Sequence, residues 1–248
     1  MIPRSCLLLL AALSVPSGSL FASPVTFFGQ GINQSGDPHT AATTNANTAH
    51  TAFLSNLSGV QTQTFESYSA GTGLPLTVSF GVAGNATLTD PSGGSAIFSG
   101  NDGAGRFPIS GSKYLETGAG SGFKITFSTP VSAFGFYGTD VGDFGGVLSL
   151  ALAGASPTTL IVPATTGSGG STTGSVLYYG FYDTTNSFTS ITFNNSGSGG
   201  VDVFGFDDFT IGTLQQVTPV AVTPEPTSLL LLSTGIGAIL SVRRLRRG

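Results

Sequence analysis

Three carboxylates stand out because each lies within a predicted strand, and two of them interrupt an aromatic one. Glu66 lies in Gln63-Thr-Phe-Glu-Ser-Tyr68, and Asp207 and Asp208 adjoin in Phe-Gly-Phe-Asp-Asp-Phe. An acid is unfavourable inside a strand unless it has a partner. If the strands that carry these residues lie side by side, the acids converge and a cation relieves their repulsion. Ca²⁺ accepts carboxylates and backbone carbonyls in flexible geometry, so the sequence predicts a calcium site at Glu66, Asp207 and Asp208.

The alternative interpretation of these three acids is that they face solvent and blunt an exposed edge strand. Asp140 and Asp143 lie in a glycine-rich turn with a spacing of three. That spacing suits one shared ion, but it is favoured as a turn in which the aspartates bond their own backbone. Asn101, Asp102 and Gly103 form a similar turn with the same two interpretations.

Nucleophilic catalysis has little support in this sequence. His39 and His50 follow no metal-ligand or nucleophile pattern, so they are interpreted as surface or packing residues. We therefore predict a protein without catalytic residues that is not an enzyme. The alternative is a glycoside hydrolase that uses two carboxylates as acid and base. Its candidate pair would come from Glu66, Glu116, Asp140 and Asp143.

The charge of the central domain excludes one class of partner. Between Ser23 and Thr223 there are three basic and eleven acidic side chains, a formal charge of −8. The whole chain carries −4 because five of its eight basic residues lie outside this segment, four of them at the C-terminal end. An acidic domain does not bind nucleic acid through phosphates, so no nucleic-acid partner is expected.

Hydrophobic periodicity predicts the elements that position these residues. Alanines, a phenylalanine and a leucine recur at helical spacing between Asp37 and Gly59, which predicts a helix at about 38–58. From Thr62 the period changes to two, with glycine, serine, proline and asparagine clusters between the runs. The predicted strands are Thr62–Tyr68, Leu76–Phe80, Ala86–Leu88, Ser95–Phe98, Lys113–Glu116, Phe123–Phe127, Ala133–Gly138, Val147–Leu152, Thr159–Val162, Val176–Tyr182, Ser187–Phe193 and Val201–Ile211.

This pattern predicts a mainly β fold: an antiparallel, jelly-roll-like β-sandwich with one N-terminal helix and a C-terminal transmembrane helix. The sandwich domain is expected to cover residues 23–212. Its last strand should have a register break at Asp207 and Asp208. Residues 213–223 lose the alternation and are expected to form an extended linker to the membrane.

The N-terminus has the features of a secretory signal peptide at residues 1–22. Arg4 supplies the positive region, Cys6–Leu13 the apolar region, and Pro16 to Gly18 a break. Cleavage is expected after Ala22, with Ser19 as the second option. Because Cys6 is the only cysteine in the chain, the mature domain would have no disulfide and no thiolate chemistry.

The C-terminus carries three features in a fixed order. Pro224, Glu225 and Pro226 come first and discourage a helix upstream. An uncharged segment, 227–242, follows and predicts a membrane-spanning helix of about 24 Å. Four arginines then end the tail and predict a cytoplasmic C-terminus with the domain outside. They are Arg243, Arg244, Arg246 and Arg247.

This tail, residues 224–248, resembles the PEP-CTERM sorting tail of bacterial exported proteins. The resemblance implies processing near Pro224–Pro226 by exosortase, a membrane-embedded cysteine protease, and an association with the envelope and the exopolysaccharide matrix. The protein would then be exported and anchored in the membrane with its ectodomain outside. Processing would release it to the cell surface or the extracellular matrix.

The phenylalanine-rich strands are similar to β-sandwich ectodomains often found ahead of this tail, which in turn resemble carbohydrate-binding jelly rolls. That likeness implies possible calcium at Glu66 and Asp208. It supplies no sugar site, because the chain has no tryptophan. Stacking platforms would have to be tyrosines: Tyr68, Tyr114, Tyr137, Tyr178, Tyr179 or Tyr182.

These observations together predict a non-enzymatic component of the cell envelope or the extracellular matrix. Polysaccharide binding with structural calcium is one form of this prediction. A purely structural or adhesive protein without a small ligand is the first alternative to it, and the hydrolase is the second.

Overall fold

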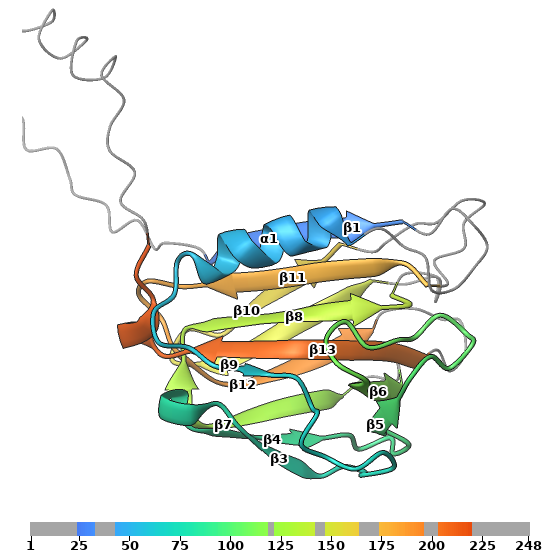
Figure 1. The fold of residues 1–248 in the computed structure, drawn as a ribbon. Coiled ribbons are helices and arrows are strands. Elements are labelled where there is room, and N and C mark those ends of the chain that lie inside the picture. The colour runs from blue at the N-terminus through green and yellow to red at the C-terminus, as the bar shows by residue number, and fades with distance from the viewer. Residues whose placement is uncertain are drawn as a thin grey trace, which may run out of the picture.

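The computed structural model describes residues 24–32, 43–118, 122–141, 147–163, 174–195 and 203–219. Two antiparallel β-sheets pack face to face, and one helix lies on the outer face of the first sheet (Figure 1). The prediction of a mainly β fold with two packed antiparallel sheets and one helix is therefore confirmed. The predicted signal peptide and sorting tail lie outside the described residues.

The first sheet has the strand order β1-β11-β8-β13-β6-β5, and β2 pairs with β13 beside this path. Its strands are β1 Val25–Gly31, β2 Thr62–Gln63, β5 Ala96–Ser99, β6 Lys113–Gly118, β8 Ala133–Thr139, β11 Val176–Tyr182 and β13 Val203–Gly212.

The second sheet has the order β10-β9-β12-β7-β4-β3. Its strands are β3 Leu76–Ser79, β4 Asn85–Thr89, β7 Phe123–Val131, β9 Leu148–Gly154, β10 Thr158–Val162 and β12 Phe188–Asn195. The described helical elements are α1 Thr44–Leu54 and two 3₁₀ turns, η1 Gly81–Ala83 and η3 Leu214–Gln216.

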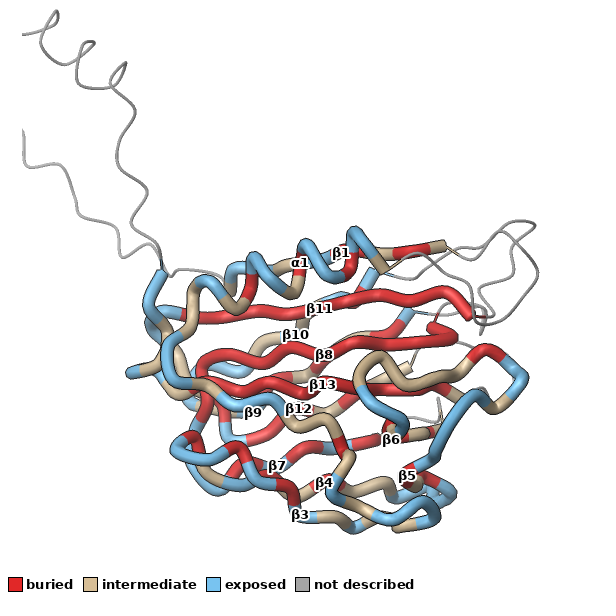
Figure 2. The backbone as a smooth tube through the Cα atoms, viewed as in Figure 1, coloured by how far each residue is buried: buried red, intermediate tan, exposed pale blue. Residues whose placement is uncertain are grey.

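Phenylalanines fill the space between the two sheets. Phe136 of β8 packs edge-to-face on Phe206 of β13, with ring centroids 5.3 Å apart, and on Phe193 of β12 at 5.5 Å. All three are nearly or fully buried. The strands β8, β11 and β13 form a continuous buried band in Figure 2. This core depends on the period-two alternation of aromatic residues that the sequence shows.

A second core lies on the outer face of the first sheet, under α1. The helix buries Ala46, Ala49 and Phe53 there. Glycines make the trough in which it lies: a Cβ at Gly29 would come 2.1 Å from the Asn45 carbonyl oxygen, and one at Gly180 would come 3.0 Å from the Phe53 ring. Small residues on the sheet therefore let the helix approach its backbone.

Three sequence expectations are corrected. The helix predicted at 38–58 ends at Leu54, and residues 55–58 form a turn and a bridge from Leu57 to Val217. The strand β1 was not predicted. Residues 213–219 of the predicted linker 213–223 pack against the sandwich through η3 and this bridge.

Within the described residues, no helix has the length and apolar character needed to span a membrane. The predicted membrane segment 227–242 lies outside them.

Candidate functional site

A β-bulge in β13 places two aspartates on the same face of the first sheet. The pairing of β13 with β8 shifts between Asp207 and Thr210, and Asp208 adopts a left-handed conformation with φ 51°. This is the register break that the sequence predicted. Because the bulge inserts one residue, Phe206 and Phe209 both stay in the inner core while the two acids lie outside it. Both acids are nevertheless buried, at 1% and 8% exposure, and β13 is a central strand, so the solvent-facing edge-strand alternative is wrong for Asp207 and Asp208.

The loop that precedes β6 covers these acids and supplies hydrogen-bond donors to them. One oxygen of Asp207 accepts from the backbone N–H groups of Ile109 and Ser110, at 2.8 and 3.0 Å. Its other oxygen accepts from the N–H of Asp208 at 2.7 Å. The Ser110 hydroxyl donates to Asp208 at 2.5 Å. Asp207 and Asp208, which we call the acid pair, therefore hold this loop onto the sheet, although it lies nearly a hundred residues away in the sequence.

Glu66 holds the same loop from its other end. The structure places it in a turn after β2, not in the middle of a strand as predicted. Its carboxylate accepts from the backbone N–H groups of Ser112 and Lys113, at 2.8 and 2.6 Å, and the Lys113 ammonium donates to its backbone carbonyl. The Ser112 backbone contact is the main cause that lowers the pKa of Glu66. The three acids predicted to meet around calcium thus surround one loop, and we call residues 109–113 the clamped loop.

Burial dominates the protonation of the acid pair. Burial, with the neighbouring Asp208 charge, raises the pKa of Asp207 to about 8, although the loop N–H donors act in the opposite direction. Burial also raises the pKa of Asp208, against the Ser110 hydrogen bond and the nearby His50. Native Asp207 therefore binds a proton more tightly than the unfolded chain does.

A group of polar aromatic side chains lies beside the acid pair, under α1. The Tyr137 hydroxyl donates to the Asn47 side chain at 2.8 Å and lies 3.1 Å from Nδ1 of His50. The Tyr178 ring lies 4.9 Å from both the His50 and Tyr137 rings, and its buried hydroxyl has no hydrogen-bond partner among the described residues. Burial lowers the pKa of His50, with Asp208 opposing. His50 is therefore a packing residue, as the sequence suggested, while His39 lies outside the described residues.

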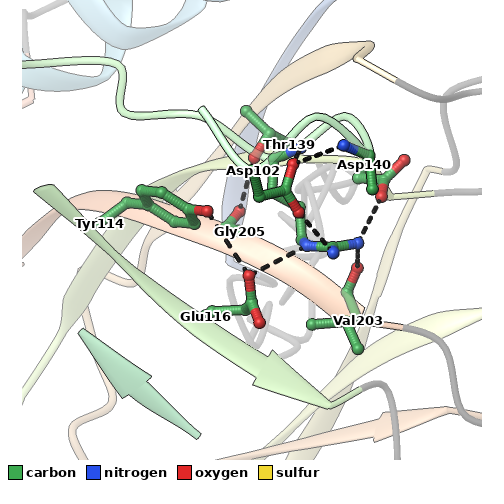
Figure 3. A network of polar contacts seen from close by, with 9 residues as sticks. Asp102, Tyr114, Glu116, Thr139, Asp140, Val203 and Gly205 are labelled. Carbon is green, nitrogen blue, oxygen red and sulfur yellow. Dashed lines mark hydrogen bonds and ion pairs between the residues drawn. The ribbon is translucent and has the colours of Figure 1, made fainter. Parts of the chain in front are cut away.

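A second polar network centres on Arg106. Its guanidinium pairs with Asp102, with Glu116 at 3.1 Å and with Asp140 at 3.0 Å, and contacts the Val203 carbonyl. Figure 3 shows these groups converging from β6, from the end of β8, from the start of β13 and from the turn at Asp102. The network therefore ties one loop to three strands of the first sheet.

The electrostatics of this network are asymmetric, with three carboxylates around one guanidinium. Burial alone would lower the pKa of Arg106, but Asp102, Glu116 and Asp140 together raise it. Burial and the Glu116 charge raise the pKa of the neighbouring Tyr114 hydroxyl well above its usual value. The arginine is thus a fixed cation that balances the acids around it.

The turn at Asp102 has the self-bonded geometry, one of the two interpretations that the sequence left open. One Asp102 oxygen accepts from the backbone N–H groups of Ala104 and Arg106, at 2.8 and 3.0 Å, so the side chain bonds its own turn. Asp140, at the end of β8, has φ 61° and is 3% exposed. Asp143 lies outside the described residues.

The geometry fits protein donors better than a calcium ion. In the part of the chain that the structure describes, no group of three or more histidine, cysteine, aspartate or glutamate side chains is close enough to hold a metal. N–H groups of the clamped loop point at Asp207 and Glu66, where a cation would need free oxygens. Calcium at Glu66, Asp207 and Asp208 stays a prediction.

The proposed hydrolase pair is likewise engaged elsewhere. Glu116 and Asp140 both bind Arg106, and Glu66 binds the clamped loop. Sequence reasoning missed Arg106 and Ser110 as their partners. One signal was present for the first: Arg106 is the only arginine between Ser23 and Thr223, in a strongly acidic domain. Ser110 carries no such signal.

No protein-family model matches this sequence, and no curated protein matches it. Among solved structures, the K2 cleaved adhesin domain of Lys-gingipain is similar over 62% of this chain and 98% of its own. The identity is 13% and the TM-score 0.37. A likeness at this level carries no argument about the activity of this chain.

Proposed function

We propose that this protein is an exported, non-enzymatic component of the cell envelope or the extracellular matrix. A signal peptide at residues 1–22 directs export, and the tail from Pro224 holds the chain in the membrane until an exosortase-type protease processes it. The observation that carries this proposal is the order of the tail: Pro-Glu-Pro, an uncharged segment and four arginines. Lipid is the environment that suits such a segment with basic residues at its edge.

The body of the protein is proposed to be a jelly-roll-like sandwich with a structural or adhesive role. Most strand neighbours in each sheet come from distant parts of the chain, which is typical of such folds. Five of the six tyrosines are buried in the structure, so they offer no stacking platform to a sugar: Tyr114, Tyr137, Tyr178, Tyr179 and Tyr182. This burial favours the structural or adhesive form of the proposal over polysaccharide binding.

The hydrogen bonds of the candidate hydrolase acids also support a non-enzymatic role. The candidate hydrolase residues Glu66, Glu116 and Asp140 each have protein donors at hydrogen-bond distance. A general acid and base need room for a sugar and a water between them. The side chains around these carboxylates hold loops instead.

The tail is tested by following the fate of the full chain in a bacterium that makes an exosortase-type protease. We compare the natural chain with a Pro224→Ala, Glu225→Ala, Pro226→Ala variant, and use Pro219→Ala as the control outside the motif. Intact mass and cell fractionation are measured. The natural and control chains should lose the tail and reach the surface, while the triple variant stays full length in the membrane. An uncut full-length natural chain dissolved in the cytoplasm would refute the proposal.

A further inference from the structure

The strand β1 is an edge of the first sheet and offers open backbone groups. Within the described residues it pairs on one side only, with β11. Successive residues of a strand point their N–H and C=O groups to opposite edges. The Gln30 carbonyl accepts a hydrogen bond from the Asn45 side chain of α1 at 3.3 Å, so this carbonyl faces away from β11. Thr26 and Phe28 have the same parity, so their backbone groups face away from β11 as well.

A groove runs along this edge between β1 and α1. Its volume is about 540 Å³, and its walls are the β1 residues 26–30 on one side and one side of α1 on the other. The helix wall consists of small residues: Asn45, Thr48, Ala49 and Ala52. A strand edge flanked by a helix is a geometry that accepts an added strand.

The strand β1 also lacks charge and proline, two of the devices that commonly protect edge strands. Neither β1 nor α1 contains a charged residue or a proline. Phe28 and Val25 are 37% and 45% exposed. Natural edge strands are blunted by lysines, prolines or bulges, because an open edge pairs with another chain.

The distribution of charged residues indicates which partner binds in the groove. The domain carries −8, so two copies repel each other through most of their surface. From Ser23 to Phe65 the only charged residue is Asp37, so β1 and α1 form a face where this repulsion is weakest. A second copy presents the same uncharged face and is therefore the partner that these surfaces suit.

We propose that β1 pairs with β1 of a second copy of this chain in antiparallel register about Phe28, joining the two first sheets. This register sets Phe28 opposite itself and Thr26 opposite Gln30, with no charge at the contact. The two-fold axis places both α1 helices on the same face, where their small residues allow close approach. The inference goes beyond the proposed function and does not depend on the sorting tail.

Cysteine cross-linking tests the register on the full chain in mild detergent, with Cys6→Ser as background. Directly opposite residues in a hydrogen-bonded antiparallel pair have Cα atoms about 5.5 Å apart, within disulfide range. Phe28→Cys should therefore give a covalent dimer on mild oxidation. Phe98→Cys is the matched control, since Phe98 is 38% exposed on the edge strand β5. Equal cross-linking of both variants would overturn the proposal.

A second measurement distinguishes a dimer formed through β1 from association through the C-terminal tail. Sedimentation in the same detergent compares the natural chain with Phe28→Lys and with Ile161→Lys, whose site on the edge strand β10 is 58% exposed. Phe28→Lys should weaken the dimer by about tenfold or more, because it removes an apolar contact and opposes two like charges. Ile161→Lys should leave it unchanged. A dimer unaffected by Phe28→Lys, or a monomeric natural chain, would overturn the proposal and leave the groove to a strand of another protein.

Discussion

Replacing Arg106 by methionine should cost about 3 kcal/mol of unfolding free energy. Methionine keeps an unbranched apolar stem but loses the cation shared by Asp102, Glu116 and Asp140. Removing one partner of a buried ion pair costs about 3–5 kcal/mol. The lower end applies here, because the side chains of Arg106, Asp102 and Glu116 keep 16%, 12% and 14% of their exposure and solvent screens them.

The measurement is urea unfolding followed by tyrosine fluorescence, since the chain has no tryptophan. In a thermal melt of a domain of this size, the same loss of about 3 kcal/mol lowers the melting midpoint by roughly 6–12 °C. Lys124→Met is the control, because it removes a positive charge from an exposed position of β7. Arg106→Lys should recover only part of the loss, since one ammonium cannot reproduce the guanidinium fork.

A stability of Arg106→Met within about 0.5 kcal/mol of the natural chain would refute this reasoning. The same holds if Lys124→Met is equally destabilising. In either case the three carboxylates would be solvated well enough without the arginine, and the network would not hold the loop.

Three further predictions follow from the outer face of the first sheet. The pKa of Asp207 is raised from 3.8 to about 8, so its contribution to stability is complete below about pH 4 and is lost as the pH rises toward 8. Denaturant midpoints measured across this range should fall in the natural chain and flatten in Asp207→Asn; parallel curves would contradict the assignment. Gly29→Ala should cost about 1–3 kcal/mol by pushing α1 away at the Asn45 carbonyl, whereas Gly73→Ala, with nothing nearer than 3.8 Å, should be nearly neutral in thermal melts. Addition of a calcium chelator should leave the melting midpoint unchanged if N–H donors satisfy the three acids, and a drop of several degrees would restore calcium as their partner.

The strands were largely predictable because one physical pattern specifies them. Val176–Tyr182 was predicted with the bounds of β11, and β8 extends the predicted Ala133–Gly138 by one residue. In both strands, phenylalanine, leucine or tyrosine residues that face the core between the sheets alternate with residues that face outward. The strand β1 was not predicted because Gly29 and Gly31 lower its strand propensity. Gly29 serves the approach of α1, which is a tertiary requirement that no local pattern reveals.

The candidate site was predictable only in part. The break at Asp207 and Asp208 was visible because two acids in succession cannot both keep the alternation. Their donors in the clamped loop were not, since nothing in the sequence relates Ser110 to an acid nearly a hundred residues later. Every residue except proline has a backbone N–H group, so the sequence does not show which of these groups donate to an acid. A buried acid therefore has the same sequence pattern whether its partner is an ion or a loop.

The two covered faces of the first sheet explain where this domain can meet other molecules. The strand β13 is buried at every position after Val203, so the acids on its outer side must find donors within the protein. The clamped loop and Arg106 provide those donors, which engages the acids in the fold. Open hydrogen-bonding groups lie instead at the β1 edge, where backbone atoms face a groove without charge. Contacts with another chain are therefore expected at this edge rather than at the acid pair.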